Sequence, residues 1–263
     1  MDLGLEGRRA LVCGASKGLG FAVAEALVRE GAQVIVNSRN EGSLRSAAEQ
    51  LETRTGKRAG WLAADLTQPD QREQLFARSV EAMGGVDLLL INAGGPPPGP
   101  FESHTQQSWR LAIELALGCA THLCALALPA MKDRRFGRIA QIVSIAGLEV
   151  IDGLILSNAS RPAVIGFAKA LAREVGPYNI LVNSICPGIF LTDRIREVTD
   201  QQARQRGITQ EQALSSLAGD IPVGRAGNPS ELGDLAAFLL SPRNTYITGA
   251  AIPIDGGKTR RLA

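Results

Sequence analysis

Short apolar runs alternate along this chain with longer stretches whose apolar residues recur at helical spacing. The runs are rich in valine, isoleucine and leucine, which is typical of parallel strands buried on both faces. The predicted strands span residues 9–13, 33–36, 59–63, 86–91, 138–143, 180–185 and 250–254. The predicted helices span residues 18–30, 41–55, 69–83, 105–131, 157–176 and 229–240. The alternation predicts a doubly wound α/β sheet, whose right-handed crossovers place ligands at the carboxyl ends of the strands.

The chain has 263 residues, 45% of them hydrophobic, and shows no internal repeat, low-complexity tract or interdomain linker. This length and composition suffice for one large core. We therefore expect a single Rossmann-like domain over residues 1–263.

The charges nearly cancel, at a net +2, and no dense basic run is interleaved with aromatic residues. Nucleic acid is therefore not an expected partner. The four cysteines fall on apolar segments without a CxxC pair, which favours reduced, buried thiols over disulfides or zinc ligands. We expect a cytoplasmic protein without a bound metal.

Membrane insertion is not expected either. The N-terminus lacks the basic start and apolar stretch of a signal peptide. The most apolar long segment, residues 111–131, is interrupted by Glu114 and His122. We interpret it as a buried or interface helix.

A glycine-rich turn, Gly14-Ala15-Ser16-Lys17-Gly18-Leu19-Gly20, joins the first predicted strand to the first predicted helix. Glycines permit a tight turn and let backbone amides approach a pyrophosphate at the positive end of a helix. The spacing differs from the GxGxxG fingerprint, and such a turn taken alone can be a packing device.

Further motifs follow in register: Asn92-Ala93-Gly94-Gly95 after an apolar run, Ser144, and Pro187-Gly188 followed by Thr192. Together with the glycine turn they resemble the short-chain dehydrogenase/reductase family over almost the whole length. The 3-oxoacyl-carrier-protein reductase group of that family is the most similar. The resemblance implies a nicotinamide dinucleotide cofactor and hydride chemistry.

The resemblance also assigns the cofactor contacts. It implies that Asp65, followed by Leu66, binds the adenine and that Asn92-Ala93-Gly94 lies beside the nicotinamide ribose. Pro187-Gly188 and Thr192 match the segment that holds the carboxamide. Asp, Asn and Gly also favour turns on their own, so each assignment has a simpler alternative.

The second predicted strand ends at Val36-Asn37-Ser38-Arg39, where no acidic residue is present to bind a ribose and disfavour a 2′-phosphate. Arg39 offers a forked cation suited to phosphate, and Ser38 and Lys17 can join it. We therefore predict NADP(H) rather than NAD(H). The alternative is that Lys17 and Arg39 are ordinary exposed bases.

The catalytic positions depart from the family pattern. The resemblance implies a tyrosine as proton donor and a lysine four residues later, but Ser157 and Arg161 occupy these positions. Ser144 matches the serine that polarises the carbonyl, and Ala116 falls where an asparagine holds a relay water. A serine is a poor acid and an arginine keeps its proton, so proton transfer is expected to be slow.

Three other side chains are candidate proton donors. Glu149 and Asp152 lie between Ser144 and Ser157 in sequence, and His104 follows a proline-rich turn at residues 94–100. Each of the three is more often surface than catalyst. Asn158 can donate a hydrogen bond but cannot protonate a carbonyl, and Tyr178 follows the helix end and is too distant. We expect the proline-rich turn either to wall the site or to be a plain surface turn, and segment 189–219 to cover the substrate.

Two functions remain. The first is an NADP(H)-dependent oxidoreductase that reduces a carbonyl or oxidises an alcohol of a small molecule. In it Ser144 polarises the carbonyl, Ser157 relays a proton, and Arg161 contacts both the cofactor ribose and the oxyanion. The alternative is an NADP(H)-binding protein without redox turnover, acting as a sensor or partner subunit. The resemblance further implies a homotetramer, assembled through residues 105–131, residues 157–176 and the C-terminal strand.

Overall fold

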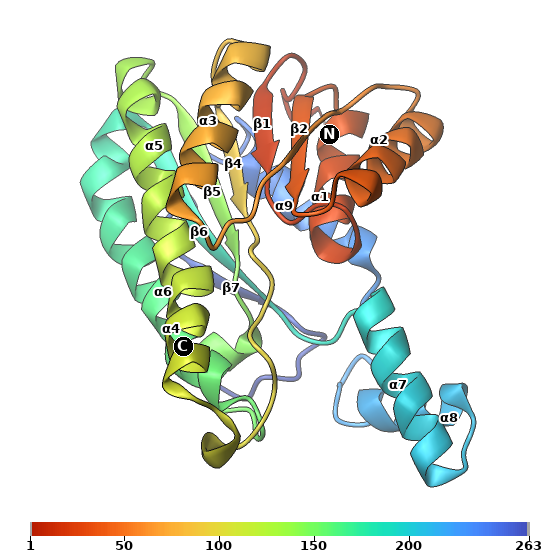
Figure 1. Cartoon of the computed structure of the whole chain (residues 1–263). Coiled ribbons are helices and arrows are strands. Elements are labelled where there is room, and N and C mark those ends of the chain that lie inside the picture. The colour runs from red at the N-terminus through yellow and green to blue at the C-terminus, as the bar shows by residue number, and fades with distance from the viewer. Residues whose placement is uncertain (1, 262–263) are drawn as a thin grey trace.

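Seven parallel strands form one sheet, and helices cover both of its faces (Figure 1). The computed structural model describes residues 2–261. The strand order is β3-β2-β1-β4-β5-β6-β7, with every neighbouring pair parallel. The predicted doubly wound sheet is confirmed. The chain reverses its direction of sheet growth between β1 and β4, so a crevice is expected at their carboxyl ends.

All seven predicted strands are present, with ends that differ from the predicted ones by at most two residues. They are β1 (Arg9–Val12), β2 (Gln33–Ser38), β3 (Gly60–Ala63), β4 (Leu88–Ile91), β5 (Gly137–Ile142), β6 (Ile180–Pro187) and β7 (Ala251–Ile254). Strands β4, β5 and β6 are buried at every residue, which explains the high apolar content of these segments; β5 and β6 also bury a few polar side chains.

The helices form a layer on each face of the sheet (Figure 1). One layer consists of α1 (Gly18–Arg29), α2 (Glu41–Thr55) and α9 (Pro229–Leu240), and the other of α3 (Pro69–Met83), α5 (Cys119–Asp133) and α6 (Ile155–Val175). Short helical turns are η1 (Phe101–Ser103), η3 (Ile145–Gly147) and η4 (Gly176–Tyr178). Two helices, α7 (Asp193–Arg206) and α8 (Gln210–Ala218), project as a hairpin beyond the carboxyl edge of the sheet.

The predicted continuous helix over residues 105–131 is wrong in one detail. The structure divides it into α4 (Gln106–Ile113), a π-turn η2 (Glu114–Gly118) and α5. The Glu114 carboxylate lies 2.6 Å from the buried guanidinium of Arg72. It occupies the space that a Cβ on Gly118 would need, at 2.5 Å. The wider turn therefore serves the ion pair with α3, in agreement with the tendency of π-turns to mark special sites.

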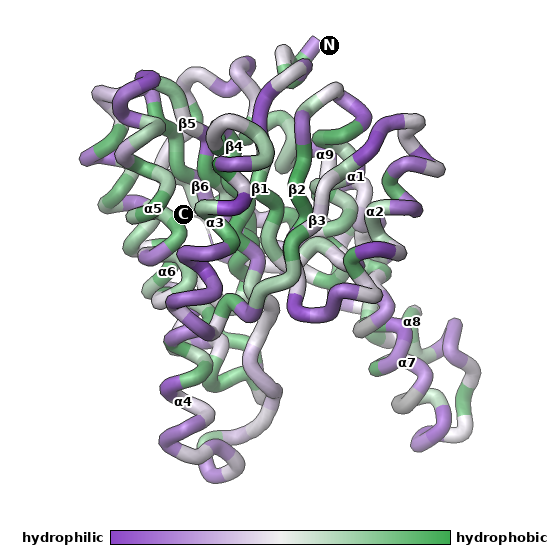
Figure 2. The backbone as a smooth tube through the Cα atoms, turned by 45° about the horizontal axis from the view of Figure 1, so that its top comes forward, coloured by the Kyte–Doolittle hydropathy of each residue, from purple (hydrophilic) through white to green (hydrophobic). Residues whose placement is uncertain are grey.

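The helical stretch Gln106–Asp133 has a mean hydropathy of 1.9 in its most apolar window, 39% of which is buried. Within residues 2–261 it is the one helix that is long and apolar enough to cross a membrane. Figure 2 shows it as a largely apolar segment beside the sheet. Its packing against α3 and α6 favours our interpretation as a core or interface helix.

Arg138 ties the opposite, amino-terminal edge of the sheet together. Its buried guanidinium donates to the carbonyl oxygens of Gly137 (2.9 Å), Asn179 (2.8 Å), Ser241 (3.3 Å) and Asn244 (3.1 Å). No carboxylate pairs with it among residues 2–261. Burial lowers the pKa of Arg138 to about 10, so the side chain remains charged at neutral pH.

The glycine turn approaches the end of β4 closely. A Cβ on Gly14 would stand 2.1 Å from the carbonyl oxygen of Asn92, and one on Gly20 would stand 2.3 Å from the oxygen of Gly14. The Asn92 amide donates to the same Gly14 oxygen at 3.0 Å. Glycine at these positions is thus required by the close backbone approach between β1 and β4.

Replacing Gly14 with alanine should therefore cost more than the strain of its positive φ of 59°. We expect Gly14→Ala to lower the free energy of unfolding by more than about 3 kcal/mol, because the clash involves backbone atoms. The control is Gly56→Ala, since Gly56 has a φ of 72° but nothing within 4 Å of the added Cβ. Strain alone should cost about 1–2 kcal/mol there. Equal costs in urea denaturation would contradict the clash.

Candidate active site

The first turn of α1 is open to an anion. Lys17 occupies the N-cap position but makes no side-chain capping bond, so the amides at the helix start keep their outward direction. Thr192, the N-cap of α7, packs against this turn, with its methyl 3.6 Å from where a Cβ on Gly18 would stand. Uncapped amides at a positive helix end fit a pyrophosphate. The structure thus brings together Gly14–Gly20 and Thr192.

The side chains predicted to bind a 2′-phosphate lie at the surface, next to the glycine turn and the end of β2. Lys17 and Arg39 are exposed, Ser38 is half-buried, and neither cation forms an ion pair with any residue in the 2–261 range. Their charge is therefore available to a ligand at the end of β2.

Asn37 is a residue of this region that sequence reasoning missed. Its buried side-chain amide donates to the carbonyl oxygens of Leu62 (3.0 Å) and Ala64 (3.2 Å), and its main-chain carbonyl accepts from the backbone amide of Ala15 (2.8 Å). Asn37 therefore fixes β2 to both the glycine turn and the end of β3. The available signal was an asparagine two residues before Arg39 at the end of a buried strand, but an amide alone does not say what it binds.

The residues predicted to contact the adenine and the nicotinamide ribose are held in place by local hydrogen bonds. The Asp65 carboxylate accepts from the amide and hydroxyl of Thr67, both at 2.9 Å, and Leu66 is buried. Asn92 supports the glycine turn, as described above, and Ala93-Gly94 follow it at the end of β4. Asp65 is thus a turn-former here, with a second carboxylate oxygen outside those bonds.

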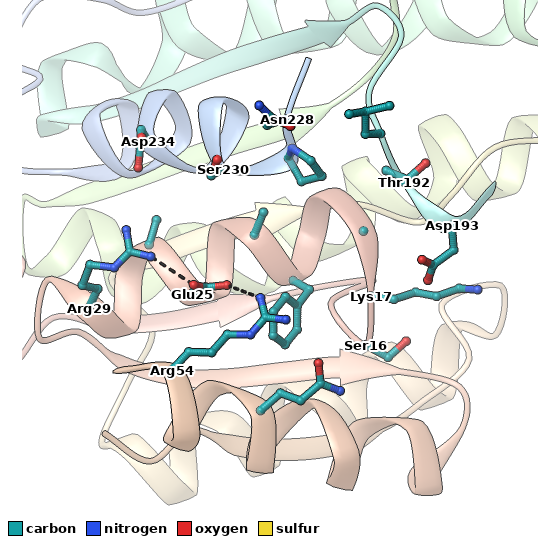
Figure 3. A pocket seen from close by; sticks show the side chains of 17 residues that line it. Ser16, Lys17, Glu25, Arg29, Arg54, Thr192, Asp193, Asn228, Ser230 and Asp234 are labelled. Carbon is teal, nitrogen blue, oxygen red and sulfur yellow. Dashed lines mark hydrogen bonds and ion pairs between the residues drawn. The ribbon is translucent and has the colours of Figure 1, made fainter. Parts of the chain in front are cut away.

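A cavity of about 520 Å³ adjoins the glycine turn on the side of α1 and α9 (Figure 3). Ser16, Lys17, Thr192 and Asp193 line one part of it. Farther along α1, the carboxylate of Glu25 points to Arg29 (3.0 Å) and Arg54 (3.1 Å). The cavity does not include Ser144, Ser157 or Arg161, so it borders the glycine turn and not the predicted catalytic residues.

Ser144 and Ser157 lie on either side of the loop that follows β5. The Ser144 hydroxyl accepts from the amide of Ala146 at 3.0 Å and so caps η3. Its hydrogen remains available as a donor to a carbonyl. Ser157 lies in the first turn of α6 and is half-buried.

Arg161 is buried one turn further along α6. Its Nη2 donates to the carbonyl oxygen of Gly94, while its Nε has no partner within the described part of the chain. Its Cβ lies 3.2 Å from the position of a Cβ on Gly147, directly after Ser144 and Ala146. Burial lowers the pKa of Arg161 to about 10, and Cys186 opposes this weakly. The guanidinium therefore remains a fixed cation at neutral pH.

The end of β6 completes the carboxyl edge. Burial raises the pKa of the Cys186 thiol to about 11, so the group is neutral and unreactive. Pro187 ends the strand, and a Cβ on Gly188 would stand 2.7 Å from the Cβ of Asp255. This close packing sends the chain toward Thr192 and the glycine turn.

The substitute proton donors have structural roles. Glu149 accepts from the amide of Arg260 at 3.2 Å, and His104 bonds the carbonyl oxygen of Gly99 at 3.3 Å. Asp152 is exposed on the loop before α6. Tyr178 lies beyond the far end of α6, roughly 30 Å from Ser157 at 1.5 Å per residue, as expected.

Comparison with known proteins shows extended similarity. A family model described as Enoyl-(Acyl carrier protein) reductase matches residues 14–259. The D-beta-hydroxybutyrate dehydrogenase of Cupriavidus necator is 34% identical over 254 residues, which is 96% of this chain and 98% of that protein. The 3-oxoacyl-(acyl-carrier-protein) reductase FabG of Vibrio cholerae is 34% identical over 255 residues, covering 97% and 98%.

The fold is equally similar to solved structures. The L-sorbose reductase of Gluconobacter frateurii, complexed with NADPH and L-sorbose, superposes with a TM-score of 0.96 at 31% identity over the full length of both chains. The glycine turn, the seven-stranded order and these full-length matches agree with the resemblance found in the sequence. The chain therefore belongs to the short-chain dehydrogenase/reductase family of oxidoreductases.

Proposed function

We propose that this protein is an NADP(H)-dependent oxidoreductase that interconverts a carbonyl and an alcohol on a small molecule. The observation that carries the proposal is the uncapped glycine turn with two free cations, Lys17 and Arg39, at its rim. Ser144 and Arg161 stand at the same edge of the sheet, where the family performs its chemistry. The relatives named above are dehydrogenases and reductases, which favours turnover over a sensor without activity.

NADP(H) rather than NAD(H) is the proposed cofactor. No acidic side chain ends β2, and Arg39 with Ser38 and Lys17 suits a 2′-phosphate. The NADPH in the L-sorbose reductase complex supports this choice. Asp65 and Leu66 would face the adenine, Asn92-Ala93-Gly94 the nicotinamide ribose, and Pro187-Gly188 with Thr192 the carboxamide.

The reduced cofactor supplies a hydride, and the protein must supply charge and a path for one proton. The Ser144 hydroxyl donates a hydrogen bond to the substrate carbonyl, and Arg161 stabilises the negative charge that develops on its oxygen. Arg161 cannot give up its proton at neutral pH, because its pKa of about 10 is well above 7. The proton therefore comes from solvent through the Ser157 hydroxyl, which acts as a relay.

We also propose a homotetramer in the cytoplasm. Leu111 and Ile113 on α4 are 40% and 51% exposed, so the layer of α4–α6 offers an apolar surface to a second copy. The four cysteines are buried free thiols, which suits a reducing compartment.

Turnover is the primary test. NADPH deuterated at the transferring position should be incubated with L-sorbose, acetoacetate and a 3-oxoacyl thioester. We expect deuterium on the product carbon for at least one carbonyl, at a rate about 10²–10⁴ below that of enzymes with a positioned acid. Binding of NADPH without deuterium transfer to any of a broad panel would instead support the sensor alternative.

Arg39→Ala tests the cofactor choice. Loss of a charge-assisted bond to the 2′-phosphate should raise the Kd for NADPH about 10- to 100-fold, while the Kd for NADH stays the same. Arg78→Ala, at an exposed position on α3, is the control and should change neither. An equal effect of Arg39→Ala on both cofactors would exclude a 2′-phosphate contact.

Ser157→Tyr tests the missing acid. A phenol is much easier to ionise than a serine hydroxyl, and the nearby Arg161 cation favours its ionised form. We expect kcat for the active substrate to rise at least about tenfold. Ser157→Phe has the same bulk without the hydroxyl and should give no increase. A similar rise in both variants would mean that packing, and not acidity, limits the rate.

A further inference from the structure

Two loops flank the site and are bonded to each other. The first covers residues 94–100, with its four prolines, and the second covers residues 151–154. The amide of Gly99 donates to the carbonyl oxygen of Gly153 at 2.7 Å, and Gly99 pairs with Leu154 as an isolated parallel bridge. The proline-rich turn is therefore docked onto the loop that leads into α6.

Helix α6 holds each loop separately. The Asn158 amide donates to the carbonyl oxygen of Ile151 at 2.8 Å and accepts from its amide at 3.1 Å, as a neighbouring strand would. One turn later, Arg161 donates to the carbonyl oxygen of Gly94. These hydrogen bonds and the chain segments between them form a closed ring. It runs from Asn158 to the loop of residues 151–154, crosses from Gly153 to Gly99, and follows the proline-rich loop to Gly94, which is bonded to Arg161 on α6.

Glycines shape the ring at three of its links. Gly94, Gly99 and Gly153 have backbone φ values of 80°, 150° and 73°, which residues other than glycine rarely adopt. A Cβ on Gly99 would also stand 2.4 Å from the Ser103 hydroxyl oxygen. The backbone path of both loops is therefore specified by the sequence.

We infer that the first two turns of α6 use this ring to join both loops into one wall, and that Asn158 is a positioning residue for the nicotinamide end of the cofactor site. Gly94 follows Asn92-Ala93, so the ring sets where the end of β4 lies relative to Arg161. Asn158 acts through Ile151, Gly153 and Gly99 without touching the cofactor. The cofactor part of this inference rests on the proposed function, whereas the ring does not.

A local role for Asn158 makes a different prediction. An asparagine that only orders its own loop affects Ile151 and its neighbours. An asparagine within a closed ring also affects Gly99, which it does not contact. The two roles are distinguished by measuring how fast the backbone amides around Gly99 exchange with solvent.

Hydrogen–deuterium exchange of the full chain without ligand measures that loop directly. In Asn158→Ala, we expect the peptide covering residues 93–105 to exchange about five- to tenfold faster, because loss of two hydrogen bonds lowers the local opening energy. Ala159→Ser, at the adjacent exposed position, is the control and should not change this peptide. Faster exchange confined to residues 150–154 would overturn the ring.

Ligand-binding measurements distinguish a positioning role of Asn158 from a general loss of structure in the variant. NADPH and adenosine 2′,5′-bisphosphate share the adenine end, but only NADPH reaches the nicotinamide end. In Asn158→Ala, the Kd for NADPH should rise about three- to tenfold, while that for the bisphosphate changes less than twofold. Asn158→Asp keeps the acceptor for the Ile151 amide, so its Kd for NADPH should fall between the values of the unaltered protein and of Asn158→Ala. An equal loss of both ligands, or a loss of neither, would overturn the positioning role. If the bisphosphate does not bind the unaltered protein, the NADP(H) proposal fails and the exchange experiment still decides the ring.

Discussion

The contact between Asn92 and Gly14 is the constraint on which the site depends. It holds the ends of β1 and β4 so close that no Cβ fits between them. This close approach opens the start of α1 to an anion and places Ala93-Gly94 within reach of α6. The proposed phosphate-binding residues and the proposed catalytic residues thus lie on two sides of one backbone contact.

The strands and helices were largely predictable from sequence, because burial on both faces and helical periodicity leave strong patterns. The π-turn at Glu114–Gly118 was not. It depends on a buried Arg72 that comes from a helix distant in sequence, and nothing in the local pattern reveals that partner. The ends of α1 and α6 differ from the predicted ones by one or two residues, which is the ordinary uncertainty of a helix end.

Spacing in the sequence was sufficient to name Ser144, Ser157 and Arg161 as candidates, and their roles stay a prediction. The partner of Arg161 was not predictable, because the carbonyl of Gly94 reaches it only after two loops have met. This bond changes the chemical meaning of the substitution. A lysine carries a point charge on a flexible stem, whereas this guanidinium is bonded to a backbone carbonyl and presents a charge of fixed direction. Asn37 was missed for the same reason, since its partners lie on β3.

Arg138 has a consequence for how such a protein diverges. Its guanidinium holds together the edge of the sheet that faces away from the cofactor, and its acceptors there are four main-chain carbonyl oxygens and, at 3.4 Å, the side-chain oxygen of Asn179. The cohesion of that edge therefore does not depend on which side chains occupy the reactive edge. Related proteins that share this arrangement can exchange an acidic or basic residue near the coenzyme without destabilising the sheet. New chemistry then becomes accessible through a few substitutions.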